Sequence, residues 1–156
     1  MTTKYIAKHE GKIVGKRTTK DRTYTHAIVV QDVEEAARKA AYNYTSNKTD
    51  SSNFEYWSVL TKQGRLHPHL SASYHSDAHV AAEVAKAQAI IDGGFDAYVR
   101  RLRERAIAGF EKRKADGGFE PFVVAWAGRL DLAQKAAAQH TWASRKLIAI
   151  VPAEIA

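Results

Sequence analysis

The chain has 156 residues, of which 45% are hydrophobic and 26% charged, and its composition excludes an intrinsically disordered protein. The length favours a single globular domain, residues 1–156, with its own hydrophobic core. The formal net charge of +7 points to an anionic partner, such as nucleic acid or an acidic protein.

Two absences from the sequence indicate where we expect the protein to be located and which chemistry it cannot perform. There is no cysteine, which excludes disulfides, a thiol nucleophile and cysteine-ligated zinc. No segment approaches the roughly 18 consecutive apolar residues of a membrane-spanning helix, and the first residues lack the apolar run of a signal peptide. We therefore expect a cytoplasmic protein with no membrane partner.

The first 31 residues favour an antiparallel β-meander. Three strands are predicted at Lys4–His9, Lys12–Thr18 and Arg22–Gln31, with turn residues between them. In the third of these strands, apolar side chains alternate onto both faces. A strand that is apolar on both faces is typically covered on both, so we expect it to lie centrally.

A helix and a long loop are predicted next. Asp32 is a suitable N-cap, and small apolar residues recur at helical spacing as far as Tyr44. Residues 46–75 are rich in Ser, Asn and Thr, and only Phe54–Thr61 resembles a strand. This stretch is predicted to be a long loop, and unstructured connections of such length are often functional.

Two Asp-Gly-Gly-Phe segments, beginning at Asp92 and Asp116, mark helix ends in the second half of the chain. Glycine just after a helix adopts the left-handed conformation that closes it. The pattern predicts helices from about 77 to 92 and from 95 to 115. A strand, a helix and a final strand are predicted at Pro121–Trp126, Leu130–Gln139 and Lys146–Val151.

These elements predict an α+β fold in a single domain. The N-terminal antiparallel β-meander and a C-terminal β-α-β unit are expected to share one mixed sheet, packed by three to four helices. The mixed character follows from the last connection, which is long enough for a parallel crossover.

Basic and aromatic residues predict a binding surface for nucleic acid or for an acidic protein partner. Lysine and arginine neutralise phosphates, and exposed aromatic rings stack on bases. The alternative is that the arginines form a solvated helix face and that the aromatic residues anchor the loop in the core. The predicted binding residues are Lys12, Lys16, Arg17, Arg22, Phe54, Tyr56, Trp57, Arg100, Arg101, Arg103 and Arg105.

A histidine cluster predicts a different function. His67, His69, His75 and His79 fall within thirteen residues. Imidazole is a good ligand for zinc and other transition metals, and histidines on a loop and at a helix start can converge on one ion. The alternative is that these are solvated loop histidines.

The leading hypothesis is a small, non-enzymatic, cytoplasmic binding protein that needs no cofactor. Accessory and inhibitory proteins of mobile elements use basic surfaces in this way, so by analogy we expect the protein to be one of these. The alternative is a hydrolase dependent on zinc or another transition metal, centred on the histidine cluster. A third hypothesis is a homodimer that pairs through an exposed strand of the meander.

Overall fold

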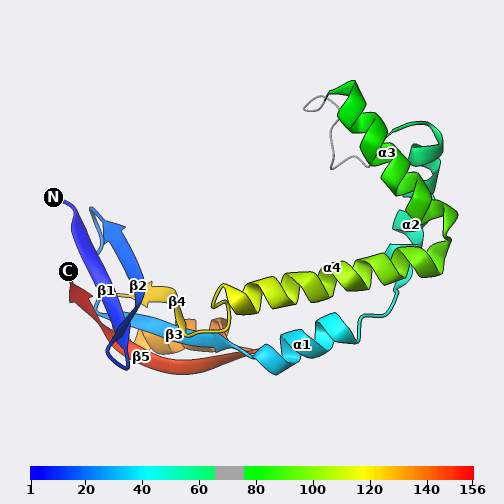
Figure 1. Ribbon diagram of the computed structural model, residues 1–156. Helices are drawn as coiled ribbons and strands as arrows, with labels where there is room; N and C mark the ends of the chain where they lie inside the picture. The colour runs from blue at the N-terminus through cyan, green and yellow to red at the C-terminus, as the bar shows by residue number, and fades with distance from the viewer. Residues whose placement is uncertain (66–75) are drawn as a thin grey trace. The chain divides into compact units, whose positions relative to one another are not determined.

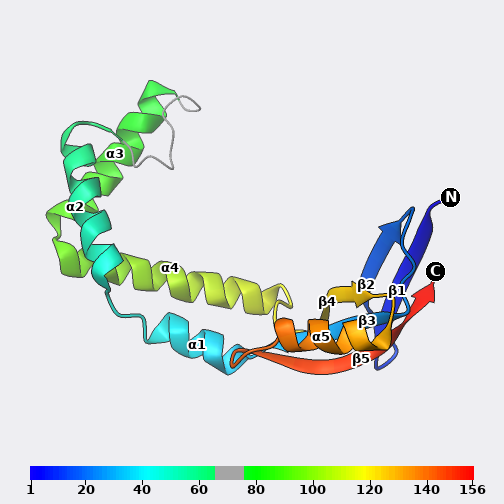
Figure 2. The same cartoon turned by 180° about the vertical axis from the view of Figure 1, so that it is seen from behind.

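The computed structural model describes residues 1–65 and 76–156 and confirms the α+β class. The chain divides into two compact units. The sheet unit comprises residues 1–38 and 111–156, and the helical unit comprises residues 39–110. Figures 1 and 2 show the elements from opposite sides.

Five strands form one sheet with the order β2-β1-β5-β3-β4. Every strand pair in the described residues is antiparallel, so the predicted mixed sheet is wrong in this detail. The last two strands do run parallel, but β3 lies between them and pairs with both. The strands are β1 (Thr3–His9), β2 (Lys12–Thr19), β3 (His26–Asp32), β4 (Phe122–Ala127) and β5 (Arg145–Ile155).

Strand β3 lies in the core of the sheet unit, as its two apolar faces predict. Ile28 and Val30 pack on one face against Ala133 and Ala137 of α5 (Leu130–Gln139), the helix labelled beside the sheet in Figure 2. On the other face, Ala27 and Val29 form a cluster with Ala7 of β1 and Val151 of β5. The strand is therefore paired at both edges and buried on both faces.

The edge strand β2 packs closely against β4. A Cβ atom added at Gly15 of β2 would lie 2.4 Å from Cγ2 of Val123 on β4. This distance is far below van der Waals contact, so only glycine permits the approach. The absence of a side chain at Gly15 thus allows the sheet to curl.

Helix α1 (Glu34–Tyr42) follows β3, and the helical unit contains α2 (Lys48–Lys62), α3 (Asp77–Asp92) and the first part of α4 (Phe95–Ala115). The two Asp-Gly-Gly-Phe segments end α3 and α4 as predicted. Gly94 and Gly117 adopt φ angles of 87° and 74°, in the left-handed region.

Helix α2 occupies much of the stretch predicted as a loop, and the strand expected at Phe54–Thr61 is wrong. A capping box starts the helix: Asp50 N donates to Asn47 Oδ1 and Asn47 N donates to Asp50 Oδ2, both at 3.0 Å. Tyr44 Oη also donates to Asp50 Oδ2, at 2.8 Å. These bonds satisfy a buried carboxylate and fix the first turn.

Candidate functional site

Aromatic side chains pack between α2 and α4 in the helical unit. Phe54 of α2 lies with its ring centroid 5.5 Å from that of Phe95 and 5.3 Å from that of Tyr98. Trp57, one helical turn further, lies 5.6 Å from Tyr98. Tyr98 is buried. The predicted aromatic segment therefore serves in part as core, with Phe54 held among other rings.

A pocket of about 370 Å³ opens beside these rings, between α2, α3 and α4; we call it the α2–α3–α4 pocket. Each of α3 and α4 contributes residues three and four positions apart, which lie on one face of a helix. The single contribution of α2 is an indole ring. The lining residues are Trp57, Glu83, Lys86, Ala87, Ile90, Tyr98, Arg101, Leu102 and Arg105.

The charged lining of this pocket is mainly cationic. Lys86, Arg101 and Arg105 contribute positive charge, whereas Glu83 is the one carboxylate among the described lining residues. Lys86 Nζ lies 2.8 Å from Glu83 Oε1. The pocket thus retains an excess of cations beside an indole ring.

Tyr98 adds a neutral polar group to this lining. Burial raises the pKa of its phenol, the charge of Asp50 raises it further, and that of Arg105 opposes both. The hydroxyl therefore keeps its proton at neutral pH.

The structure brings together three of the predicted binding residues, Trp57, Arg101 and Arg105. Arg100 and Arg103 are exposed on α4 but do not line the pocket, and Tyr56 is 50% exposed on another side of α2. The remaining predicted cations belong to the sheet unit, where all are exposed. They are Lys12, Lys16 and Arg17 on β2 and Arg22 before β3.

The sequence does not single out Lys86 and Tyr98, and it suggests Glu83 only as an additional ligand or orienting group for the metal site. Ala87, which belongs to the predicted apolar stripe of the helix from 77 to 92, does line the pocket. The available signal was spacing, because Glu83 and Lys86 are three residues apart and Lys86 adjoins Ala87. Tyr98 likewise precedes Arg101 by three residues.

Most of the predicted metal cluster lies outside the described residues. This applies to His67, His69 and His75, whereas His79 is exposed in the first turn of α3, where its backbone N donates to Ser76 Oγ at 3.3 Å. Within residues 1–65 and 76–156, no three His, Asp or Glu side chains are grouped to hold a metal ion. The metal site stays a prediction.

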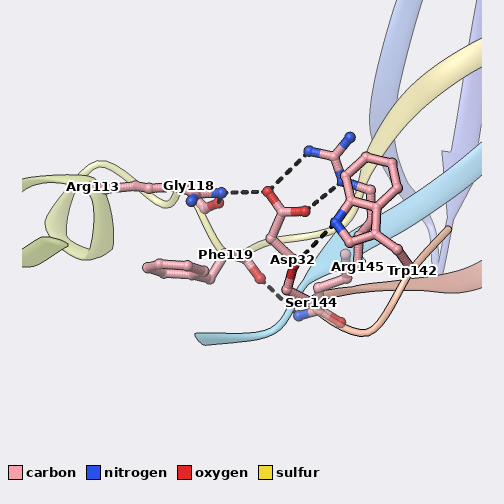
Figure 3. A network of polar contacts seen from close by, with 8 residues as sticks. Asp32, Arg113, Gly118, Phe119, Trp142, Ser144 and Arg145 are labelled. Atoms are coloured by element: carbon pink, nitrogen blue, oxygen red, sulfur yellow. Dashed lines mark hydrogen bonds and ion pairs between the residues drawn. The ribbon is translucent and has the colours of Figure 1, made fainter. Parts of the chain in front are cut away.

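The sheet unit contains a second polar cluster, centred on Asp32 at the end of β3 (Figure 3). Arg145 of β5 donates to this carboxylate through Nε at 2.5 Å and through Nη2 at 3.2 Å, and Arg113 of α4 donates to it from the other side. The hydrogen bonds from Arg145, followed by those from Arg113, lower the pKa of Asp32 against the opposing effect of burial. One carboxylate thus joins three segments that are far apart in the sequence.

Aromatic rings hold both arginines of this cluster. The guanidinium of Arg113 lies 4.4 Å from the ring centroid of Phe119, and Arg113 Nη2 also donates to the carbonyl oxygen of Gly118. The guanidinium of Arg145 lies 4.6 Å from the ring of Trp142, whose Nε1 donates to Ser144 Oγ. Since these cations are engaged by protein groups, the cluster acts mainly in holding the sheet unit together.

No known protein family matches the chain, and neither the curated proteins nor the solved structures include a significant match to it. Among the described residues, no helix combines the length and the apolar character needed to cross a membrane.

Proposed function

We propose that the protein is a non-enzymatic, cytoplasmic binding protein that takes up single-stranded nucleic acid in the α2–α3–α4 pocket. The observation that carries this proposal is the placement of Trp57 beside Arg101 and Arg105 in one pocket. An indole ring stacks on any base, and guanidinium groups neutralise the phosphates on either side of it.

The shape of the site favours a single strand over a duplex. The pocket volume of about 370 Å³ falls in the range of about 300–1,000 Å³ typical of small-ligand sites, so it accommodates one nucleotide rather than a helix. A base in a duplex is already stacked and paired, and must be extruded before it can enter a pocket. An unpaired base enters at no such cost.

Two double variants of α4 test the proposal. Arg101→Gln/Arg105→Gln removes two charges that line the pocket, whereas Arg100→Gln/Arg103→Gln removes two exposed charges of the same helix that do not. We expect the first variant to weaken binding more, and to reduce the slope of log K against log salt by about 1.4, at about 0.7 for each lost phosphate contact.

Binding is measured by fluorescence anisotropy of a mixed-sequence, single-stranded oligonucleotide at several salt concentrations. The second variant, which has the same net charge, should stay close to the wild type. Equal weakening by both variants would show a general charge effect and would contradict the assignment to the pocket. Absence of wild-type binding at low salt would refute the proposed function itself.

A further inference from the structure

We infer that the open edge of β5 binds an extended segment of a partner protein as an added β-strand. This edge belongs to the sheet unit, so the inference goes beyond the α2–α3–α4 pocket and does not depend on the function proposed for it. Three observations support it: a length of β5 with a strand on one side only, main-chain groups that point away from β3, and exposed apolar side chains beside them.

One side of β5 is covered only near its end. Strand β3 pairs with residues 145–152 of β5, whereas β1, on the other side, pairs with residues 153–155. A single bridge joins Arg145 to Trp142 at the start of β5. Within the part of the chain that the structure describes, no strand pairs with residues 146–152 on the side away from β3 (Figures 1 and 2). Over this length β5 is therefore an edge strand.

Leu147 presents main-chain hydrogen-bonding groups at this open edge. Arg145 N donates to Trp142 O at 3.0 Å and Trp142 N donates to Arg145 O at 3.1 Å, so the main chain of Arg145 points away from β3. The direction repeats every second residue of an antiparallel strand, which gives Leu147 the same orientation. Unpaired N–H and C=O groups on a sheet edge are a template for pairing with another chain.

Ile150 presents a second set of such groups. Ala153 N donates at 2.9 Å to the carbonyl oxygen of Thr25, which directly precedes β3. The N–H of Ala153 thus points towards β3, and the main chain of Ile150, three residues earlier, points away. A β-bulge at Ile148 lies between Leu147 and Ile150, so the two outward residues are an odd number of positions apart.

Two exposed apolar side chains lie beside these groups. Trp142 is 52% exposed and Leu147 is 44% exposed. Trp142 is bridged to Arg145, and Leu147 follows Arg145 by two residues, so both side chains are on one face of the sheet. Trp142 Nε1 donates to Ser144 Oγ at 3.0 Å, which fixes the indole before anything binds. A side chain that is already ordered loses little entropy when a partner covers it.

The charge pattern of the edge defines the segment that fits it. Residues 147–151 read Leu-Ile-Ala-Ile-Val and carry no charge, and the exposed Lys146 precedes them. The matching segment is extended and apolar, with a carboxylate beside Lys146. The edge strand β2 differs, because it carries exposed cations, which hinder strand pairing. A second copy of this chain is disfavoured, because two copies that each carry a net charge of +7 repel each other.

A phage-displayed library of random peptides of about ten residues, long enough for one strand, tests the inference on the whole protein. We expect the enriched peptides to share alternating apolar residues next to Asp or Glu. A synthetic peptide of the enriched sequence should bind in fluorescence anisotropy. The same peptide with alternate amides N-methylated should not bind, because it lacks the main-chain donors of an added strand.

Two leucine variants locate the binding surface. Leu147→Lys places a charge at the open edge and should weaken peptide binding by about tenfold or more. The matched control is Leu132→Lys on α5, because Leu132 is 47% exposed and lies outside the edge. This control should bind the peptide like the wild type. Circular dichroism checks that both variants are folded.

Each of the other outcomes overturns the inference. A library that yields no binder, or peptides that bind Leu147→Lys as tightly as the wild type, removes the edge as a docking site. Binding that survives N-methylation shows that the peptide does not pair as a strand. Self-association of the wild type in light scattering that Leu147→Lys abolishes assigns the edge to a second copy of this chain instead of a partner protein.

Discussion

At the scale of single residues, a comparison of Trp57 with the neighbouring Tyr56 tests whether a ring stacks on the ligand inside the pocket or whether any aromatic side chain of α2 contributes equally to binding. Trp57 lines the α2–α3–α4 pocket, whereas Tyr56 does not. Removing a stacking ring typically costs about 1–3 kcal/mol per base. We expect Trp57→Leu to weaken oligonucleotide binding by this amount and Tyr56→Leu to have little effect, both measured by anisotropy. Equal losses in the two variants would argue against stacking in the pocket.

Asp32 is the residue on which the stability of the sheet unit should depend at acid pH. Its pKa is lowered in the folded protein from an unfolded value of about 3.9, so the charged form stabilises the fold above about pH 4. This stabilisation is lost as the pH falls towards the folded-state pKa. Asp32→Asn should cost about 1–3 kcal/mol at pH 7 and should flatten the decline of unfolding free energy below about pH 4, measured by urea denaturation.

Asp131 provides a control for this prediction. Arg129 lowers the pKa of Asp131 to about 2, but both side chains are exposed, and water and salt screen their interaction. Asp131→Asn should therefore destabilise the protein less than Asp32→Asn does. An equal loss in the two variants would contradict a structural role for the Asp32 cluster.

At the scale of elements, the surroundings of Gly15 and Gly109 predict opposite effects on stability when each glycine is replaced by alanine. Gly15→Ala forces a methyl group into Val123 and should destabilise the packing of β2 on β4 by about 1–3 kcal/mol. Gly109→Ala lies within α4 with nothing within 4 Å of the added carbon, and should stabilise the helix by about 0.5–1 kcal/mol. Denaturant unfolding measures both, and a neutral Gly15→Ala would show that β2 does not require this close approach.

The elements also show what could be predicted from the sequence. The positions of α3 and α4 could be predicted from local sequence, because glycine ends each helix and an apolar stripe runs along it. Helix α2 was missed because the aromatic and β-branched segment Phe54–Thr61 resembles a strand, although Phe54, Trp57 and Thr61 also have helical spacing. The Asn47 capping box was the local signal that favoured the helix.

Strand pairing and the choice of pocket residues depend on contacts distant in the sequence. No local pattern indicates that β5 inserts between β1 and β3, because this pairing joins the two ends of the chain. Similarly, cations surround much of α4, so composition identifies arginine as a binding residue type without indicating which arginines face the pocket. Arg101 and Arg105 are distinguished from Arg100 and Arg103 only once α2 and α3 are in place.

At the scale of the whole molecule, the two units should differ in local stability. Strand β3 is hydrogen-bonded to β4 and β5 and buried on both faces, whereas α2 and α3 in the helical unit contain few buried residues. We expect native-state hydrogen exchange to be slowest for amides of β3 and faster for those of α2 and α3. Uniform protection along the chain would instead indicate one cooperative unit.

The order of the strands also has a consequence for where the chain tolerates change. Strands β3 and β4 are antiparallel neighbours, and residues 39–110 lie between them in the chain, where a short turn would suffice to connect them. The helical unit therefore occupies a hairpin connection, the kind of position at which additional segments are best tolerated. Substitutions within residues 39–110 should thus leave the register of β3 and β4 unchanged.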